Sequence, residues 1–482
     1  MKSSRFALKL RPAFACVAIT FFLAVCAQAQ TLTTLANFNG KNGQRPMYGP
    51  LVQATNGSFF GVAWGGEHGR GEVYELNMAG RLGVIYSFCA LADCSDGGDP
   101  EAAPVVGDDG NLYGTTNSGG NPANNSGTIF KMTIGGKLTT LYTFCPGAFC
   151  TDGQFPVGLT QARSGNFYGA ATNGGANGDG TIFEITKSGA FRVLHDFCSQ
   201  QDCADGSWPE AAPIQASDGN FYGTTFEGGA YGFGVVYELT LEGRYSALYS
   251  FCSTQSCPDG AYPGGQLVEE ASGNFFGTTS GGGSYGLGTV FEITASKDLR
   301  TIVSFDSTDG AYPGSALAPA NDGNFYGVAD GGGAFGGGTI FEISSEGEIS
   351  TLYNFCAPSG CTKASPNAPV QPLFQGTDGN LYGTTVVGGS GTDGTVFSFS
   401  TGLGPLVETI PMAAQVGAHV IILGNNLTGS TAVAFNGTAA AFTVVSATEI
   451  TTTVPSGATT GTVSVAMPSG TLYSNPQFVV ME

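Results

Sequence analysis

The sequence predicts an all-β protein in which a seven-bladed β-propeller is followed by a small β-sandwich. One motif, roughly D-G-N-F-Y-G-T-T, then G-G, then G-T-I-F-E-I-T, recurs along most of the chain. The central glycines of its copies are Gly61, Gly114, Gly169, Gly223, Gly277, Gly327 and Gly383. A period of about 50 residues that persists this long is typical of stacked supersecondary units. A change of composition after the last copy indicates a second domain.

The first 29 residues have the features of a secretory signal peptide. Four basic residues flank or precede an apolar stretch at residues 13–26, and Ala27-Gln28-Ala29 is a small-x-small cleavage site. We therefore expect a leader at residues 1–29. Leu23-Ala24-Val25-Cys26 leaves a lipoprotein signal as an alternative, although Val25 is bulky where that signal has a small residue. No later segment has ~20 continuous apolar residues, so we expect no transmembrane segment.

Each repeat is expected to form four short strands. In the third repeat these are Leu159–Ala162, Asn166–Ala171, Gly180–Thr186 and Phe191–Phe197. Apolar and polar residues alternate within them, and Ser-Gly or Asp-Gly pairs between them are typical of hairpin turns. Four antiparallel strands in about 50 residues make one propeller blade, and seven such units suit a closed ring.

The phase of the repeats indicates how the ring closes. Residues 31–38 resemble a fourth strand such as Leu138–Phe144, whereas the seventh copy ends after its third strand at residues 395–399. Pairing the two ends would complete a propeller over residues 30–402 and remove two exposed sheet edges. An open solenoid, the alternative, would gain nothing from this offset and would need polar caps.

Ten cysteines beyond the leader form five pairs of identical spacing. The pairs are Cys89 and Cys94, Cys145 and Cys150, Cys198 and Cys203, Cys252 and Cys257, and Cys356 and Cys361. The repeats that lack the first cysteine also lack the second, so we expect each pair to form a local disulfide. An even count in an exported chain supports this interpretation. Zinc is the rival, but one pair offers two ligands where a structural site takes four.

The region from residue 403 to residue 482 reads as a small β-sandwich. Aromatic residues thin out after Gly402, and Thr, Val and Ala become frequent. The expected strands are Val420–Leu427, Ala432–Gly437, Ile450–Pro455 and Gly461–Val465. About 80 residues suffice for a compact two-sheet domain.

The repeat motif and the motifs of the C-terminal region each resemble a known family. The repeat, over residues ~31–402, resembles the GloVer (Gloeobacter/Verrucomicrobia) tandem repeat of exported bacterial proteins. G-x-x-V-x-I-x-G-N-N-L, F-N-G-T and I-T-T-T-V-P-S-G-A-T-T-G resemble an IPT/TIG immunoglobulin-like domain. The first implies an extracellular location or the outer cell surface, and the second a spacer or adhesion module. A few IPT/TIG relatives bind DNA. This chain has a net charge of −20, which a nucleic-acid backbone would repel, so we expect no nucleic-acid partner.

Candidate ligand-binding residues gather on one predicted face of the propeller. The links between successive blades, and between second and third strands, share a face and carry the longer loops. The aromatic residues predicted there are Trp208, Tyr231, Phe233, Tyr262, Tyr285, Tyr312 and Phe335. Such rings can stack on sugars or grip a peptide. Alternatively, residues that recur at one repeat position pack one blade against the next.

Metal and catalytic signals are weaker. Asp109, Asp218, Asp322 and Asp378 begin D-G-N runs that suggest calcium, but their spacing is not that of an EF-hand and Asp-Gly is a preferred hairpin turn. We therefore expect no metal and no cofactor.

Three histidines, His68, His195 and His419, lie far apart without metal-ligand spacing. His195 replaces a repeat tyrosine and is expected to be a structural substitution. His68 lies near Trp64, Glu67 and Arg70, in the segment that departs most from the repeat.

Two functions of different class fit these observations. The first is a secreted or cell-surface binding or scaffold protein, expected to be monomeric, that recognises an extracellular glycan or protein. The second is a carbohydrate-active enzyme, a lyase or hydrolase, on the same propeller, since propellers also host enzymes. Carboxylates that converge at the mouth of the channel would favour the enzyme.

Overall fold

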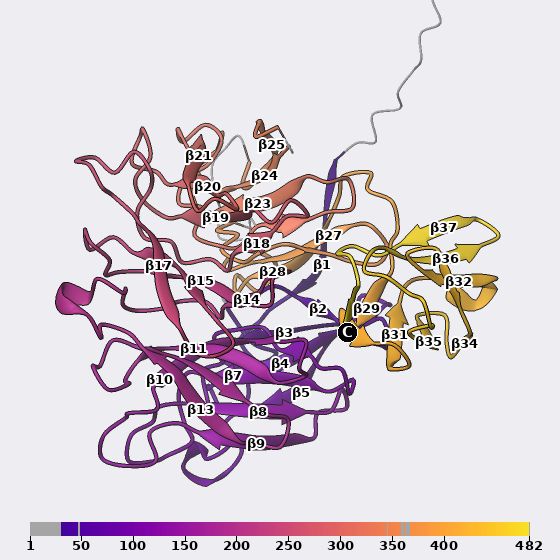
Figure 1. Ribbon diagram of the computed structural model, residues 1–482, viewed down its shortest axis with the longest axis horizontal. Helices are drawn as coiled ribbons and strands as arrows, with labels where there is room; N and C mark the ends of the chain where they lie inside the picture. The colour runs from indigo at the N-terminus through magenta and orange to yellow at the C-terminus, as the bar shows by residue number, and fades with distance from the viewer. Residues whose placement is uncertain (1–29, 47–48, 345, 358–360, 362–366, 482) are drawn as a thin grey trace, which may run out of the picture.

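The computed structural model describes residues 30–46, 49–344, 346–357, 361 and 367–481, and the expected leader lies outside them. Over this part of the chain the repeats form seven four-stranded antiparallel sheets, here numbered blades 1 to 7 (Figure 1). A propeller followed by a β-sandwich is therefore confirmed. Among the described residues, no helix has the length and apolar character needed to cross a membrane.

The strands of the blades follow the repeats in order. Blade 1 contains β2 (Val52–Gln53), β3 (Phe59–Ala63), β4 (Glu72–Leu76) and β5 (Leu82–Ser87). Blade 2 contains β6 (Val105–Val106), β7 (Leu112–Thr116), β8 (Thr128–Met132) and β9 (Leu138–Thr143). Blade 3 contains β10 (Gln154–Gln161), β11 (Phe167–Asn173), β12 (Thr181–Ile185) and β13 (Phe191–Asp196). Blade 4 contains β14 (Ile214–Gln215), β15 (Phe221–Thr225), β16 (Val235–Leu239) and β17 (Tyr245–Ser250).

Blade 5 contains β18 (Val268–Glu269), β19 (Phe275–Thr279), β20 (Thr289–Ile293) and β21 (Leu299–Ser304). Blade 6 contains β22 (Ala318–Pro319), β23 (Phe325–Ala329), β24 (Thr339–Ile343) and β25 (Ile349–Asn354). Blade 7 contains β26 (Phe374–Gln375), β27 (Leu381–Thr385), β28 (Thr395–Ser400) and, from the start of the chain, β1 (Thr31–Asn37).

The predicted closure of the ring is confirmed by the pairing of β1 with β28. The register joins Thr31 to Ser400 and Asn37 to Thr395. Buried apolar clusters lie between neighbouring blades all around the ring, and one of them joins Tyr382 of blade 7 to Phe59 of blade 1, whose rings stack 4.1 Å apart. The same stacked pair recurs between blades 2 and 3, where it consists of Tyr113 and Phe167. The seam is therefore packed like the other blade junctions.

The central glycine of each repeat leaves room for an aromatic ring. Gly114 in β7 lies opposite Phe130 in β8, and a Cβ atom on Gly114 would lie 2.5 Å from the Phe130 ring. Gly383 and Phe397 repeat this arrangement in blade 7. A larger residue at the central position would displace a fully buried ring, which explains why the sequence repeats a glycine there.

A second recurring joint ties each blade to the one before it. The residue before the first proline of each blade donates its N–H to a carbonyl of the preceding blade, as Tyr312 does to Leu287 at 2.8 Å. The proline then packs on the next glycine, since a Cβ on Gly288 would lie 2.6 Å from Pro313 Cδ. All seven residues before these prolines have positive φ: Arg45, Asp99, Phe155, Trp208, Tyr262, Tyr312 and Ala368. This conformation is uncommon for bulky residues, so the joint fixes their direction firmly.

The two faces of the ring differ in their connections. The loop face carries the links between blades and the loops between second and third strands, whereas the turn face carries the short turns. Across the turn face, glutamine side chains join neighbouring blades: Gln53 accepts from the Thr377 N–H at 3.0 Å and Gln215 from the Arg163 N–H at 2.8 Å.

The C-terminal domain consists of two packed sheets. One contains β29 (Glu408–Ile410), β31 (His419–Leu423), β35 (Glu449–Thr453) and β34 (Phe442–Val444). The other contains β33 (Thr438–Ala440), β32 (Ala432–Phe435), β36 (Val463–Met467) and β37 (Gly470–Tyr473), and β30 (Ala413–Gln415) pairs with β38 (Val479–Met481). The four expected strands are present, while the three-residue strands were not foreseen.

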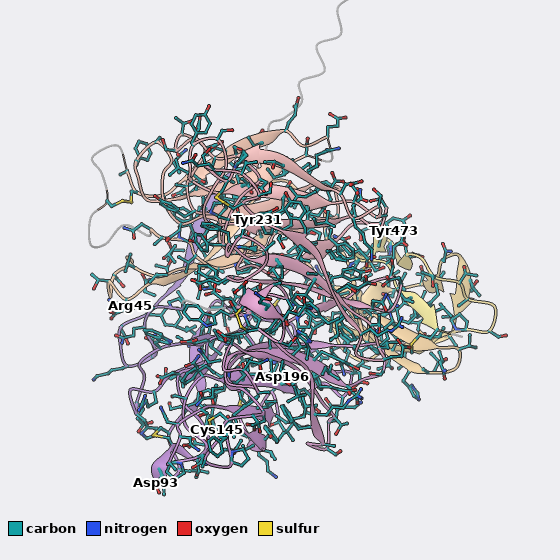
Figure 2. All side chains as sticks on the ribbon, turned by 60° about the vertical axis from the view of Figure 1, so that its left-hand side comes forward. Arg45, Asp93, Cys145, Asp196, Tyr231 and Tyr473 are labelled. Atoms are coloured by element: carbon teal, nitrogen blue, oxygen red, sulfur yellow. A yellow bond between two sulfur atoms is a disulfide. The ribbon has the colours of Figure 1, made fainter. Side chains whose placement is uncertain are left out.

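This domain rests on the turn face of the propeller. Thr448 Oγ1 donates to the Thr55 carbonyl at 3.1 Å, and Asn425 Nδ2 donates to Thr377 Oγ1 at 2.9 Å. Thr55 and Thr377 both belong to turns between first and second strands. Figure 2 shows Tyr473 on the side of this domain, with Arg45 and Asp93 on the opposite side of the molecule. The loop face is thus left clear of the C-terminal domain.

Candidate functional site

The predicted aromatic residues lie on the loop face of blades 4 to 6, but they do not form one cluster. Four of the rings are exposed: Trp208, Tyr231, Tyr285 and Tyr312. Phe233, Tyr262 and Phe335 are half-buried. Tyr262 contacts Phe233 at 5.4 Å and Phe226 at 5.1 Å between ring centroids, so part of its surface packs against the preceding blade. The exposed rings remain the ones that a ligand can reach.

The backbone holds several of these rings in fixed positions. Trp208, Tyr262 and Tyr312 each precede the proline of the inter-blade joint and have φ values of 55°, 61° and 61°. The Trp208 N–H donates to the Asp179 carbonyl at 3.0 Å, which anchors the ring to blade 3. Rings carried by a backbone that these joints hold in place lose little conformational freedom when a ligand binds, so this arrangement favours recognition.

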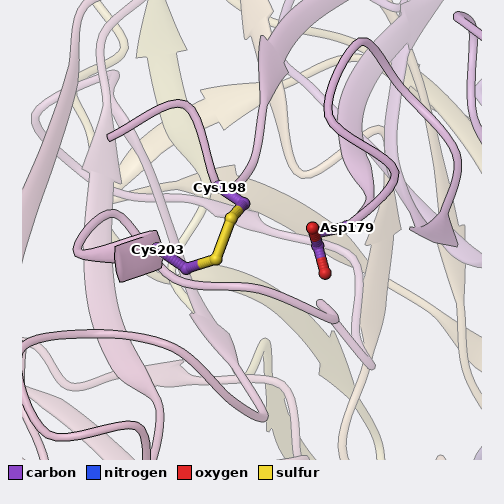
Figure 3. Close-up of side chains that lie close together, drawn as sticks. All are labelled: Asp179, Cys198 and Cys203. Atoms are coloured by element: carbon purple, nitrogen blue, oxygen red, sulfur yellow. A yellow bond between two sulfur atoms is a disulfide. The ribbon is translucent and has the colours of Figure 1, made fainter. Parts of the chain in front are cut away.

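Five disulfides stiffen the same face. They join the expected partners, Cys89–Cys94, Cys145–Cys150, Cys198–Cys203, Cys252–Cys257 and Cys356–Cys361. Disulfides of this kind persist in oxidising surroundings. Figure 3 shows Asp179 beside the Cys198–Cys203 bridge; these atoms lie within 4.8 Å of one another, but sulfurs bonded to each other are not thiolate ligands for a metal.

An aspartate organises each of several cysteine loops. Asp152 accepts from the Tyr142 hydroxyl at 2.7 Å, and Asp259 accepts from the Tyr249 hydroxyl at 2.7 Å. In blade 3, His195 Nε2 takes the tyrosine's place 3.2 Å from Asp205. His195 is therefore the structural substitution expected from the sequence. Burial lowers the pKa of His195, against the opposing charge of Asp205.

Two glutamates that the sequence analysis did not single out, Glu101 and Glu210, lie in the segments that lead into the first strands of blades 2 and 4. The first strands of neighbouring blades contact one another around the axis, as β2 and β6 do, so the segments that lead into them line the mouth of the central channel. Glu101 and Glu210 follow the joint prolines of blades 2 and 4, one on each side of blade 3. The sequence feature that could have pointed to them is the segment Pro-Glu-Ala-Ala-Pro, which both of these repeats contain.

The two carboxyl groups differ in their exposure to solvent. Burial, followed by the negative charges of Asp99 and Glu210, raises the pKa of Glu101 to about 7. The Glu210 side chain is exposed to solvent, so it does not share the buried setting that raises the pKa of Glu101. Asn117 Nδ2 donates to Glu101 Oε2 at 2.7 Å and orients that carboxyl group. A carboxyl group with a pKa near 7, such as that of Glu101, can donate or accept a proton at that pH.

The unusual loop of blade 1 is held by a buried carboxylate. Glu72 is 1% exposed, and it accepts from the Glu67 N–H at 3.1 Å and from Ser87 Oγ at 2.9 Å. Burial raises the pKa of Glu72. Arg70 forms an ion pair with Asp99 at 2.8 Å, whereas Glu67 and His68 are exposed. The loop is therefore anchored by Glu72 and Arg70 rather than built around His68.

The repeats and the C-terminal domain both match known families. The Gloeobacter/Verrucomicrobia repeat matches residues 20–204 and 199–370. The chain belongs to this repeat family. The IPT/TIG domain matches residues 406–480. A comparison of the chain with curated proteins found no match.

Several solved structures are similar to the chain at low identity. A streptogramin B lyase is 14% identical, with a TM-score of 0.49 over 78% of this chain and 98% of its own. An extracellular domain described as part of a two-component system of B. thetaiotaomicron is 11% identical, with a TM-score of 0.49 over 82% of this chain and 46% of its own. An aldose sugar dehydrogenase from Streptomyces coelicolor is 11% identical, with a TM-score of 0.40 over 77% of this chain and 98% of its own. At this identity no activity transfers to the present chain.

Proposed function

We propose that this protein is exported after cleavage of a leader at residues 1–29 and that it is a binding or scaffold protein for an extracellular glycan or peptide. The observation that carries the proposal is the set of exposed rings on the loop face, Trp208, Tyr231, Tyr285 and Tyr312. They are carried by blades that the proline joints tie together, on the side of the ring away from the C-terminal domain. The five disulfides support an oxidising, extracellular location.

Binding to arrays of glycans and peptides, before and after removal of the rings, tests this function. Replacement of Tyr231, Tyr285 and Tyr312 by Ala is expected to weaken binding by about 1 kcal/mol per ring, or roughly five-fold each, without a change in melting temperature. Tyr473→Ala is the matched control, because Tyr473 is 57% exposed but lies on the C-terminal domain. Undiminished binding by the triple variant would reject the proposal for these rings.

The glutamate pair favours a second candidate, a carbohydrate-active lyase or hydrolase. Glu101 supports this candidate, because burial raises its pKa to about 7, which suits general acid and base catalysis, and Glu210 occupies the equivalent position in blade 4. Release of products from a bound glycan would support this function. Turnover should then fall at least a hundred-fold in Glu101→Gln and in Glu210→Gln. It should persist in Glu348→Gln, which changes an exposed glutamate on the turn face.

A further inference from the structure

Blade 3 departs from the other blades on the loop face. Its first strand, β10, spans Gln154–Gln161, whereas the other first strands have two residues each among those described. The extension pairs Gln154 with Asn173 and Pro156 with Ala171 in β11. The start of this blade is therefore paired strand, with one bulge between Pro156 and Leu159, where its neighbours have loop.

A depression of about 480 Å³ opens beside this extended hairpin. Its walls come from the cysteine loop, the start of β10 and the glycine-rich loop after β11. The lining residues on which the argument rests are Phe149, Thr151, Gln154, Phe155 and Asn173. The Cys145–Cys150 disulfide closes one wall, so the hollow exists before any ligand arrives.

Two phenyl rings belong to this depression. Phe149 is 83% exposed, the largest exposure among the exposed apolar side chains of the described residues. Other repeats have Asp93, Asp202 or Ser256 at the corresponding position before the second cysteine. Phe155 occupies the position before the joint proline, with φ of 59°, and its N–H donates to the Ser126 carbonyl at 3.0 Å. The repeat pattern gives no packing reason for Phe149.

The polar groups of the depression are neutral. Its lining offers a hydroxyl at Thr151 and amides at Gln154 and Asn173, but no charged side chain among the residues described there. This neutrality is notable in a chain with a net charge of −20. The surrounding charge repels anionic polymers, and the lining offers no carboxylate to a cationic peptide.

We infer that the blade 3 depression is a binding subsite for a neutral saccharide, and this inference rests on the proposed binding function. A sugar ring presents apolar C–H faces to Phe149 and Phe155, while its hydroxyls find Thr151 and Asn173 at the edge. Rings that provide flat surface, together with a few neutral polar groups, are the usual make-up of such a site. Neighbouring Glu101 and Glu210 lie on the two sides of this blade.

The test uses the full mature chain with an array of neutral and acidic oligosaccharides and a peptide library, followed by calorimetry on the best neutral oligosaccharide. Phe149→Ala is expected to weaken that binding at least five-fold with an unchanged melting temperature, because the side chain is almost wholly exposed. Phe149→Trp, which keeps a flat ring, is expected to retain the binding. Tyr285→Ala serves as the comparison on blade 5.

The outcomes separate this inference from the function on which it rests. Glycan binding that is lost in Tyr285→Ala but unchanged in Phe149→Ala overturns the blade 3 subsite and leaves the binding function standing. Preference for acidic oligosaccharides, or for peptides bound through Phe149, overturns the ligand class. The absence of binding to both arrays overturns the proposed function and this inference together.

Discussion

His195 and the repeat tyrosines perform the same task with different titration behaviour. Each bonds to an aspartate beneath a cysteine loop, but only the histidine has a proton that leaves near neutral pH. Because burial lowers the pKa of His195 below its ordinary value of 6.5, folding favours its neutral form. The stability that this preference contributes is present above pH 6.5 and is lost as the pH falls below it.

His195→Tyr is therefore expected to reduce the loss of melting temperature between pH 7 and pH 5. Room for the ring exists, because Tyr142 stacks on Phe191 in blade 3 at 4.0 Å, as His195 stacks on Tyr245 at 4.0 Å. The reciprocal variant, Tyr249→His, should introduce a similar acid sensitivity into the next blade. Equal pH dependence in all three proteins would contradict this account.

Glu408 provides a test of opposite sign. Burial raises its pKa from 4.5 to about 8, so the folded protein holds this proton more tightly than the unfolded chain. Its stabilising contribution is full below pH 4.5 and is lost as the pH rises through 8. Glu408→Gln should therefore raise the melting temperature at pH 9 and change it little at pH 4.5. Exposed Glu346, replaced by Gln, is the control, and an equal effect in both variants would exclude burial as the cause.

Individual site residues were only partly predictable from the sequence. The aromatic positions were found because they recur, and recurrence marks a position in the repeat. Glu101 and Glu210 were not singled out because a glutamate in one repeat carries no signal of its place relative to the other repeats. Phe149 was missed for a related reason: its exposure is a property of the folded loop, and an isolated phenylalanine in a sequence looks like core.

The joint between blades is the element on which the spacing of the ring depends. It couples a left-handed residue, a proline and a glycine of the preceding blade. Gly288→Ala should lower the free energy of unfolding, since its φ is 99° and its Cβ would meet the Thr279 carbonyl oxygen and Pro313 Cδ. Gly286 lies two residues away with φ of 74° and open space around it. Gly286→Ala thus measures the cost of the backbone conformation alone.

Chemical denaturation gives the free energy of unfolding of the two variants, and their difference measures the cost of close packing around Gly288. We expect Gly288→Ala to cost about 1–3 kcal/mol more than Gly286→Ala, the usual range for an overpacked site. Equal costs would mean that close packing around Gly288 contributes nothing to the joint.

The sequence predicted the strands of the propeller well, because the same strand pattern recurs in seven repeats and an exception in one copy carries little weight. The four strands of blade 3 lie where they were expected, apart from the longer β10. The C-terminal domain offers no such repetition. Its three-residue strands, such as β33 and β34, bury only alternate side chains, so too few residues carry the pattern.

The whole ring depends on a strand from the start of the chain. Deletion of Thr31–Phe38 should lower the melting temperature sharply, because it exposes the edge of β28 and removes Phe38 from the cluster between blades 7 and 1. A chain that ends after residue 402 is the control: it keeps every blade and tests the proposed boundary of the C-terminal domain. An unchanged melting temperature after the N-terminal deletion would show that β1 is not the closure.

Closure by β1 also sets the order in which the molecule can mature. This strand leaves the ribosome first, yet its partner, β28, is synthesised only after six other blades. Until then the nascent chain carries an unpaired strand at one end and an open sheet edge at the other, the state most prone to pairing with a neighbouring molecule. Assembly therefore has a final step that joins residues distant in sequence, and such late long-range contacts slow folding. The edge of β28 is paired only after this strand has been made and has joined β1. Until then, pairing with other copies of the same chain must be prevented.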